Sequence, residues 1–140
     1  MRDSAMIVSI LAVKDVEASV AFYSQKLGFT YDLSLPGPDG TMAFAGVSLG
    51  AFGFGLNLEP EAAQGGPGVV FMIPVPDDAD IDAVYAAVIA KGVKLEQDIK
   101  TEYWGDRGFT VRDIDGYTLN IYKTVKQMTM DEIADAARNP

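Results

Sequence analysis

An internal duplication constrains the fold of this chain more than any other feature of its sequence. The pair Asp15-Val16 recurs 65 residues later as Asp80-Ile81, and Phe44 recurs at the same distance as Phe109. A repeat of roughly 55 to 60 residues is longer than most solenoid repeats, and it is present only twice. The sequence therefore predicts two similar modules related by pseudo-symmetry.

The first copy reads as a strand, a helix and three further strands. Residues 6–13 are apolar on both faces of a strand, which indicates burial in a sheet. Asp15 can cap the helix that follows, and Gly28 supplies its left-handed end. The apolar face of that helix is expected to consist of Val16, Val20, Tyr23 and Leu27. The remaining strands are expected at 29–35, 41–47 and 51–58.

The second copy repeats this order after a linker at 59–68, which is polar, built of small residues and rich in glycine at its end. A strand is expected at 69–75, followed by a helix that Asp78 or Asp80 opens and Gly92 closes. The apolar face of that helix is expected to consist of Ile81, Val84, Tyr85, Val88 and Ile89. The last three strands are expected at 93–98, 108–112 and 117–123.

A short amphipathic helix is expected at 129–138, with Thr129 as its cap and Glu132 completing a capping box. Ile133, Ala136 and Ala137 share one side of it. The pattern as a whole predicts one α+β domain over 1–140. Within it, module 1 spans 6–58, the linker 59–68 and module 2 69–123.

The composition excludes several kinds of chemistry. The sequence contains neither cysteine nor histidine, which removes disulfides, thiolate or imidazole metal ligands and every Ser-His or Cys-His nucleophile pair. Twenty acidic residues against eleven basic ones give a net charge of -9. This charge opposes binding to nucleic acid or anionic membranes and favours cationic ligands. The N-terminal apolar stretch, 5–13, is too short to span a membrane and lacks a signal-peptide cleavage site. A cytoplasmic location is the default expectation.

The run Tyr103-Trp104-Gly105-Asp106-Arg107 is the first candidate for ligand contact. Trp104, with Tyr103 beside it, offers an aromatic plate on which a planar ligand stacks or a cation rests, and Asp106 offers a carboxylate. The alternative for Trp104 is a loop aromatic folded onto the core. For Asp106 the alternative is a surface turn paired with its neighbour, and for Arg107 we favour this surface pair.

Strand residues supply the other candidates. Because each sheet is expected to have one face toward its helix and one open face, strand aromatics divide between the core and the open face, and the sequence leaves the division open. Gly53 and Gly55 alternate with phenylalanines and indicate room for a bulky ligand against the backbone. The candidate ligand-binding residues from strands are Phe44, Phe54, Phe109, Asn120 and Tyr122.

Residues 10–29 and 103–117, together with the duplication, resemble the vicinal-oxygen-chelate superfamily. That superfamily holds glyoxalase I, extradiol dioxygenases, methylmalonyl-CoA epimerase, fosfomycin-modifying enzymes and bleomycin-resistance proteins. The resemblance covers 6–123, and its most specific part is the helix ending in Phe22-Tyr23 and Leu27-Gly28-Phe29. It implies two βαβββ modules whose curved mixed sheets surround a cleft. The Tyr-Trp-Gly-Asp-Arg run is most similar to the bleomycin-resistance branch.

Enzymes of this superfamily hold a metal ion at four equivalent strand positions. The resemblance places those positions at Val8, Gly55, Val70 and Asn120, with Asn57 as the alternative to Gly55 in a shifted register. Of these side chains only an asparagine can coordinate, whereas a hard divalent cation takes about six oxygen ligands, several of them usually charged. We therefore expect no metal and no other cofactor, and we incline against an enzyme.

The leading hypothesis is a metal-free protein that sequesters a bulky, cationic aromatic compound in its cleft. The alternative is a metal-independent or atypical lyase or isomerase of the same superfamily. A third possibility is a vestigial pocket, or a regulatory role in a larger assembly. The working unit is expected to be a homodimer, because two four-stranded sheets in one chain leave edges and cleft walls incomplete.

Overall fold

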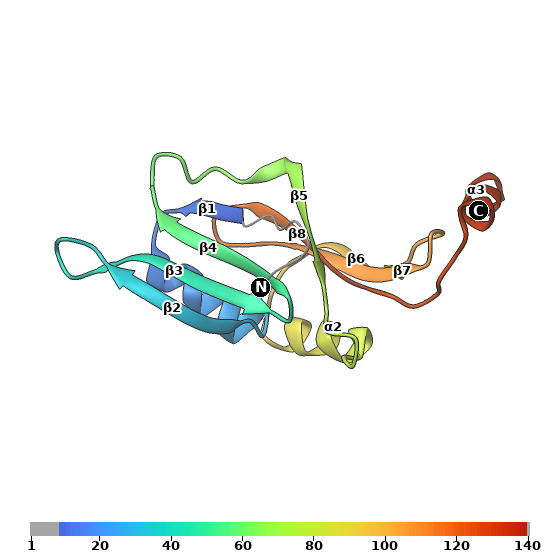
Figure 1. Ribbon diagram of the computed structural model, residues 1–140, viewed down its shortest axis with the longest axis horizontal. Helices are drawn as coiled ribbons and strands as arrows, with labels where there is room; N and C mark the ends of the chain where they lie inside the picture. Colours follow the sequence, from blue (N-terminus) through green and yellow to red (C-terminus); the bar gives the residue numbers. More distant parts are fainter. Residues whose placement is uncertain (1–8, 140) are drawn as a thin grey trace, which may run out of the picture. The chain divides into compact units, whose positions relative to one another are not determined.

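The computed structural model describes residues 9–139, which divide into two compact units (Figure 1). Unit 1 holds the described residues up to Gly65 and the turn Asp113–Gly116. Unit 2 holds Gly66–Arg112 and the chain from Tyr117 onward. Two four-stranded mixed sheets and a C-terminal helix confirm the predicted α+β fold with two βαβββ modules.

Unit 1 is built on a sheet with the strand order β1-β4-β3-β2. β1 runs parallel to β4, and the other neighbours are antiparallel. Residues 6–8 of the expected first strand lie outside the described part of the chain. The strand bounds are β1 Ser9–Val13, β2 Thr30–Pro36, β3 Met42–Leu49 and β4 Phe52–Leu58.

The helix of unit 1 begins where the sequence indicates, but it widens before it ends. The Asp15 carboxylate accepts a hydrogen bond from the Ala18 N–H at 3.0 Å and caps α1, Val16–Ala21. The chain continues as the π-helix η1, Phe22–Lys26, in which the Leu27 N–H donates to the carbonyl of Phe22. Gly28 then has the positive φ of 79° that allows the helix to end.

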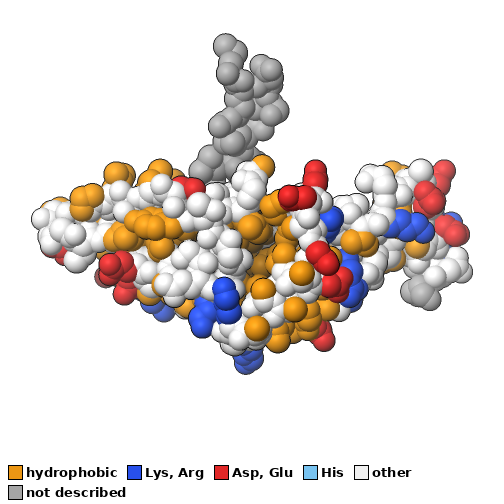
Figure 2. Space-filling model, turned by 90° about the horizontal axis from the view of Figure 1, so that it is seen from below, with side chains coloured by type: hydrophobic (Ala, Val, Ile, Leu, Met, Phe, Trp, Pro, Cys, Tyr) orange, Lys and Arg blue, Asp and Glu red, His pale blue; other side chains and the backbone are white. Residues whose placement is uncertain are grey.

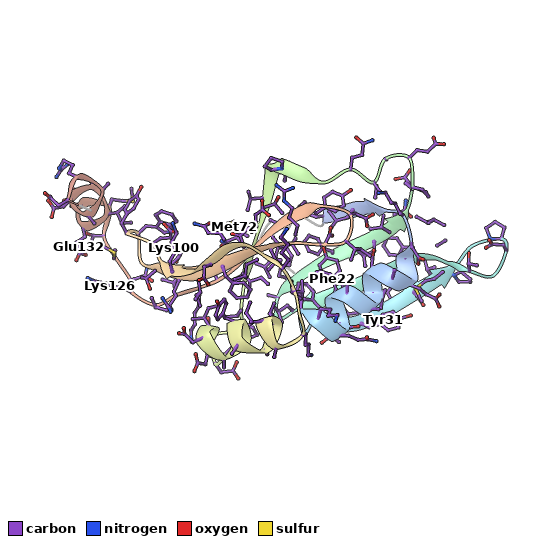
Figure 3. The ribbon with its side chains drawn as sticks, turned by 180° about the vertical axis from the view of Figure 1, so that it is seen from behind. Phe22, Tyr31, Met72, Lys100, Lys126 and Glu132 are labelled. Atoms are coloured by element: carbon purple, nitrogen blue, oxygen red, sulfur yellow. The ribbon has the colours of Figure 1, made fainter. Side chains whose placement is uncertain are left out.

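The core of unit 1 lies between this helix and one face of the sheet (Figure 3). The predicted helical face is correct, since Val16, Val20, Tyr23 and Leu27 are all buried. Tyr23 is fully buried, and its hydroxyl donates to Asp113 at 2.6 Å. Through this bond a turn that follows β7 in sequence becomes part of unit 1.

Unit 2 repeats the design with the strand order β5-β8-β7-β6. β5 runs parallel to β8, while β8, β7 and β6 are antiparallel neighbours. β5 begins three residues earlier than expected. The strand bounds are β5 Gly66–Pro74, β6 Leu95–Thr101, β7 Asp106–Arg112 and β8 Tyr117–Thr124.

Helix α2, Ile81–Ala90, begins at the Asp80 cap, whose carboxylate accepts from the backbone N–H groups of Asp82 and Ala83. Its predicted apolar face is correct only in part. Ile81 and Val88 are buried, but Ile89 is 39% exposed. Figure 2 shows hydrophobic side chains between charged ones on the outer side of the molecule over α2.

The C-terminal helix α3, Met130–Arg138, has the predicted capping box. The Thr129 hydroxyl accepts from the Glu132 N–H, and the Glu132 carboxylate accepts from the Thr129 N–H. α3 lies beyond the ends of β7 and β8, away from the sheet of unit 2 (Figure 1). None of the described helices is long and apolar enough to cross a membrane.

Candidate ligand-binding site

A pocket of about 310 Å³ lies on the face of the unit 2 sheet that does not pack against the core. Side chains in a strand point alternately to the two faces of a sheet. Phe109, Val111, Leu119 and Ile121 are fully buried on the core side. The residues between them therefore face the pocket. Its lining comes from all four strands and the β6–β7 turn: Val70, Met72, Gln97, Glu102, Trp104, Asp106, Gly108, Thr110, Thr118, Asn120 and Tyr122.

Asp106 holds Trp104 in place at the edge of this pocket. The indole Nε1–H donates to one carboxylate oxygen of Asp106 at 3.0 Å, and the Thr124 hydroxyl donates to the other at 2.6 Å. Because Asp106 begins β7 and Thr124 ends β8, the indole is tied to two strands. A side chain held in this way loses less conformational entropy when a ligand stacks on it.

The turn that carries Trp104 is closed by backbone hydrogen bonds. The Gly105 N–H donates to the carbonyl of Glu102 at 3.0 Å, and the Glu102 N–H donates to the carbonyl of Asp106 at 2.7 Å. Gly105 has a φ of 99°, which an L side chain rarely adopts. Tyr103 lies in the same turn with its ring edge-on to Trp104, at 4.9 Å between centroids. It is half exposed and flanks the pocket without lining it.

The floor of the pocket offers hydrogen-bonding groups. The Asn120 amide donates to the Thr110 hydroxyl at 3.0 Å, and its side-chain oxygen accepts no hydrogen bond from residues 9–139. The hydroxyl of Tyr122 makes no hydrogen bond to another described residue. A ligand can therefore meet an acceptor at Asn120 and a donor or acceptor at Tyr122.

The charged groups that the described residues bring to the pocket are all acidic. Glu102 and Asp106 line it, and no lysine or arginine among residues 9–139 does. Lys100 pairs with Glu102 at 3.2 Å, but the lysine is half exposed and such surface pairs are weak. The pocket therefore presents negative charge together with an aromatic plate, which is the combination that a cationic aromatic molecule requires.

Four of the predicted site residues, Trp104, Asp106, Asn120 and Tyr122, are thus brought together in one pocket. Val70, singled out as a metal position, lines it too. Sequence reasoning missed the remaining lining residues, which are Met72, Gln97, Glu102, Gly108, Thr110 and Thr118. Period-two alternation from Asn120 could have found Thr118, because Leu119 and Ile121 beside it are clearly core residues.

Two predicted site residues have core positions instead. Phe109 is fully buried, with its ring 5.3 Å from that of Tyr85 in α2. Phe54 is 3% exposed and packs against Tyr23 and Phe29, although it also lines a separate groove on unit 1. The reason is the pleat, which turns both residues toward the helix-covered face of their sheets.

Phe44 lies in a separate groove of about 370 Å³ on the unit 1 sheet. A Cβ atom added to Gly55 would lie 2.9 Å from the Phe44 ring, so the ring rests directly over the backbone of Gly55. Phe44 therefore fills the space directly beside Gly55, while Gly53 and Gly55 both line the groove, as expected for glycines that leave room against the backbone. Phe52 and Leu33 also line this groove, and Asp32 is the one charged residue among its described lining residues.

The expected metal positions can be assessed for three of the four residues, because Val8 lies outside the described part of the chain. Gly55 and Val70 have no side-chain donor, and Asn120 could offer only its side-chain oxygen, because its amide nitrogen donates to Thr110. Residues 9–139 contain no group of three His, Cys, Asp or Glu side chains placed to hold a metal ion.

A duplicated βαβββ fold with a pocket on its open sheet face defines the class, and the comparison of sequences agrees. Residues 5–121 match the model of the Glyoxalase/Bleomycin resistance protein/Dioxygenase superfamily, so the chain belongs to this superfamily. The Mycobacterium bovis protein Mb0911c is 25% identical over 90% of this chain and 88% of its own length.

Two solved structures show the same fold. TioX from Micromonospora sp. ML1 superimposes with a TM-score of 0.69 at 23% identity, over 89% of this chain and 100% of its own. TnmS3, an antibiotic-binding protein from Streptomyces sp. CB03234, superimposes with a TM-score of 0.65 at 22% identity, over 89% of this chain and 98% of its own.

Proposed function

We propose that this protein binds a bulky, cationic aromatic small molecule and sequesters it without a metal ion. The observation that carries the proposal is the pocket of unit 2, where Asp106 fixes the only tryptophan of the chain in an acidic setting. The similarity to the antibiotic-binding TnmS3 supports a binding role for this fold. Stacking and cation–π contact with Trp104 supply about 1 kcal/mol, and the net charge of -9 adds an attraction that salt screens.

The same tryptophan makes the proposal testable. Titration with a bleomycin-like glycopeptide, or with a simpler cationic heteroaromatic compound, should quench the fluorescence of Trp104. Trp104→Ala should reduce the affinity measured by calorimetry about fivefold, which corresponds to about 1 kcal/mol of binding free energy. The circular dichroism spectrum should stay unchanged, because the fold is intact. A neutral or anionic compound of equal size should bind more weakly. If tryptophan emission stays constant across such cations, or if acidic compounds bind more tightly, the proposal fails.

The alternative function is a metal-independent or atypical lyase or isomerase. Glu102 is the pocket carboxylate whose oxygens are not hydrogen-bonded within the pocket, so it is the group with which acid–base chemistry would begin. Metal analysis of the purified protein helps to distinguish the two functions. One equivalent of tightly bound metal whose removal abolishes activity would contradict metal-free sequestration and support an atypical enzyme that uses a metal, whereas ligand recovered unchanged from the protein would support sequestration.

A further inference from the structure

The C-terminal helix α3 has an apolar stripe that nothing in the described structure covers. Met130, Ile133, Ala134 and Ala137 follow the i, i+3, i+4, i+7 pattern of one helical face, and none of them is buried. Met130 is 77% exposed. An isolated helix of nine residues is marginal in water, so its stability has to come from packing of this stripe. The match to the superfamily ends at residue 121, so α3 is an addition to the part of the chain that defines the family.

The segment before α3 is anchored to the turn that carries Trp104. The Gly105 carbonyl accepts hydrogen bonds from the N–H groups of Val125 and Lys126, at 2.9 and 3.1 Å. The Lys126 carbonyl occupies the place where a side chain at Gly105 would begin. Only residues 127–129 separate this anchor from α3, a span of about 10 Å when extended. Figure 3 shows Lys126 and Glu132 close to the two ends of this short link.

An exposed aromatic pair lies at the same anchor. Tyr103 is 49% and Trp104 37% exposed, and the Met128 side chain, from the link before α3, already lies beside Gly105, the residue after Trp104. Methionine makes favourable contacts with aromatic rings and adapts to irregular surfaces. We propose that the stripe of α3 docks on Tyr103 and Trp104, so that α3 is a tethered lid over the pocket of unit 2.

The charges make closure of this lid sensitive to what the pocket contains. α3 carries Asp131, Glu132 and Asp135 against one arginine, and the pocket carries Glu102 and Asp106. Closure brings these like charges together. Salt screens the resulting repulsion, and a cation bound in the pocket neutralises it. The lid would therefore close more completely over a cationic ligand. This last step rests on the proposed function, whereas docking of α3 does not.

The sequence offers a clean test, because it contains no cysteine and one tryptophan. Ala134→Cys places a single label on the stripe, and Asp135→Cys places the same label on the polar side. A bimane dye on either cysteine is quenched when it contacts Trp104. If the closed state is at least half populated, emission of the Ala134→Cys label should be at most about half that of the same label in a Trp104→Phe background. The Asp135→Cys label should change much less.

Three further measurements decide the outcome in ligand-free, full-length protein. Adding Ile133→Asp to the Ala134→Cys variant should restore the emission of the label. Without that substitution, raising the salt from about 20 to about 500 mM should lower the emission further, because salt screens the repulsion that opposes closure. Equal emission with and without Trp104 would overturn the proposal. So would quenching of labelled Trp104→Phe chains by an excess of unlabelled wild-type chains, because α3 would then dock on a second copy. Since no ligand is present, these results stand whether or not the pocket binds cations.

Discussion

At the scale of the residue, Asp106 has two functions that the sequence could not separate. Its carboxylate contributes charge to the pocket, and its two oxygens orient Trp104 and bind Thr124. Asparagine can accept from the indole and donate to the threonine hydroxyl, so it preserves the geometry and removes the charge. Alanine removes both. Comparing the two substitutions therefore separates the electrostatic contribution of Asp106 to ligand binding from its contribution to the position of Trp104.

We expect Asp106→Asn to weaken binding of a cationic heteroaromatic compound severalfold at low ionic strength and little at high ionic strength. Asp106→Ala should weaken it at both, and it should also lower the fluorescence anisotropy of Trp104 in the free protein because the indole is released. Asp78→Asn, which removes a charge from the same unit outside the pocket, is the control. Identical salt profiles for all three variants would show that charge in the pocket has no specific role.

At the scale of the element, helix α2 is tied to its sheet by two polar contacts. The Arg107 guanidinium in β7 donates to the Asp82 carboxylate at 2.8 Å and, through another nitrogen, to the Thr101 hydroxyl. The Tyr85 hydroxyl donates to the Asp98 carboxylate of β6. The hydrogen bond from Arg107 lowers the pKa of Asp82, and the hydrogen bond from Tyr85 lowers the pKa of Asp98.

These contacts predict how stability depends on pH. A carboxylate whose pKa is lower in the folded state stabilises the fold above its unfolded pKa, about 3.9, and loses this contribution as the pH falls through the folded pKa. Urea unfolding between pH 6 and about pH 2.5 should therefore show a smaller loss of stability for Asp82→Asn and Asp98→Asn than for the wild type. Asp78→Asn should follow the wild type. Parallel curves for all four proteins would contradict the assignment.

At the scale of the whole molecule, each unit exposes apolar residues on its open sheet face. In unit 1 these include Ile10, Leu33 and Leu35, which are 61%, 49% and 57% exposed. In unit 2, Val70 and Met72 are 47% and 45% exposed. Apolar patches of this kind mark surfaces that a partner covers. They support the proposal that the working unit is a homodimer in which the open faces are covered.

Light scattering at micromolar concentration should accordingly give twice the 15.0 kDa of the chain. Met72→Asp and Leu35→Asp should shift the protein toward the monomer, because burying an unpaired carboxylate is costly. Met130→Asp in α3 is the matched control and should leave the dimer intact. A wild-type monomer at these concentrations would argue against the proposal.

The sequence by itself determined the features that depend on neighbouring residues. The duplication indicated two βαβββ modules, and Asp15, Asp80 and Thr129 cap helices because a side-chain oxygen at that position reaches free N–H groups two or three residues on. The run from Tyr103 to Asp106 could be recognised as a candidate site because an aromatic pair beside a carboxylate is unusual in a turn. The π-helix η1 had no such local signal in the sequence.

Only the tertiary structure decided which face of each strand meets a helix. Phe44 and Phe109 are equivalent in sequence, yet Phe44 lies in a groove and Phe109 in the core. In β2, a register shift pairs Tyr31 with Val47 but Leu33 with Gly46, so alternation counted along the strand fails there. The direction of a side chain depends on register and on the helix that covers the sheet. Both are set by contacts between residues far apart in the chain, and a local pattern contains no record of them.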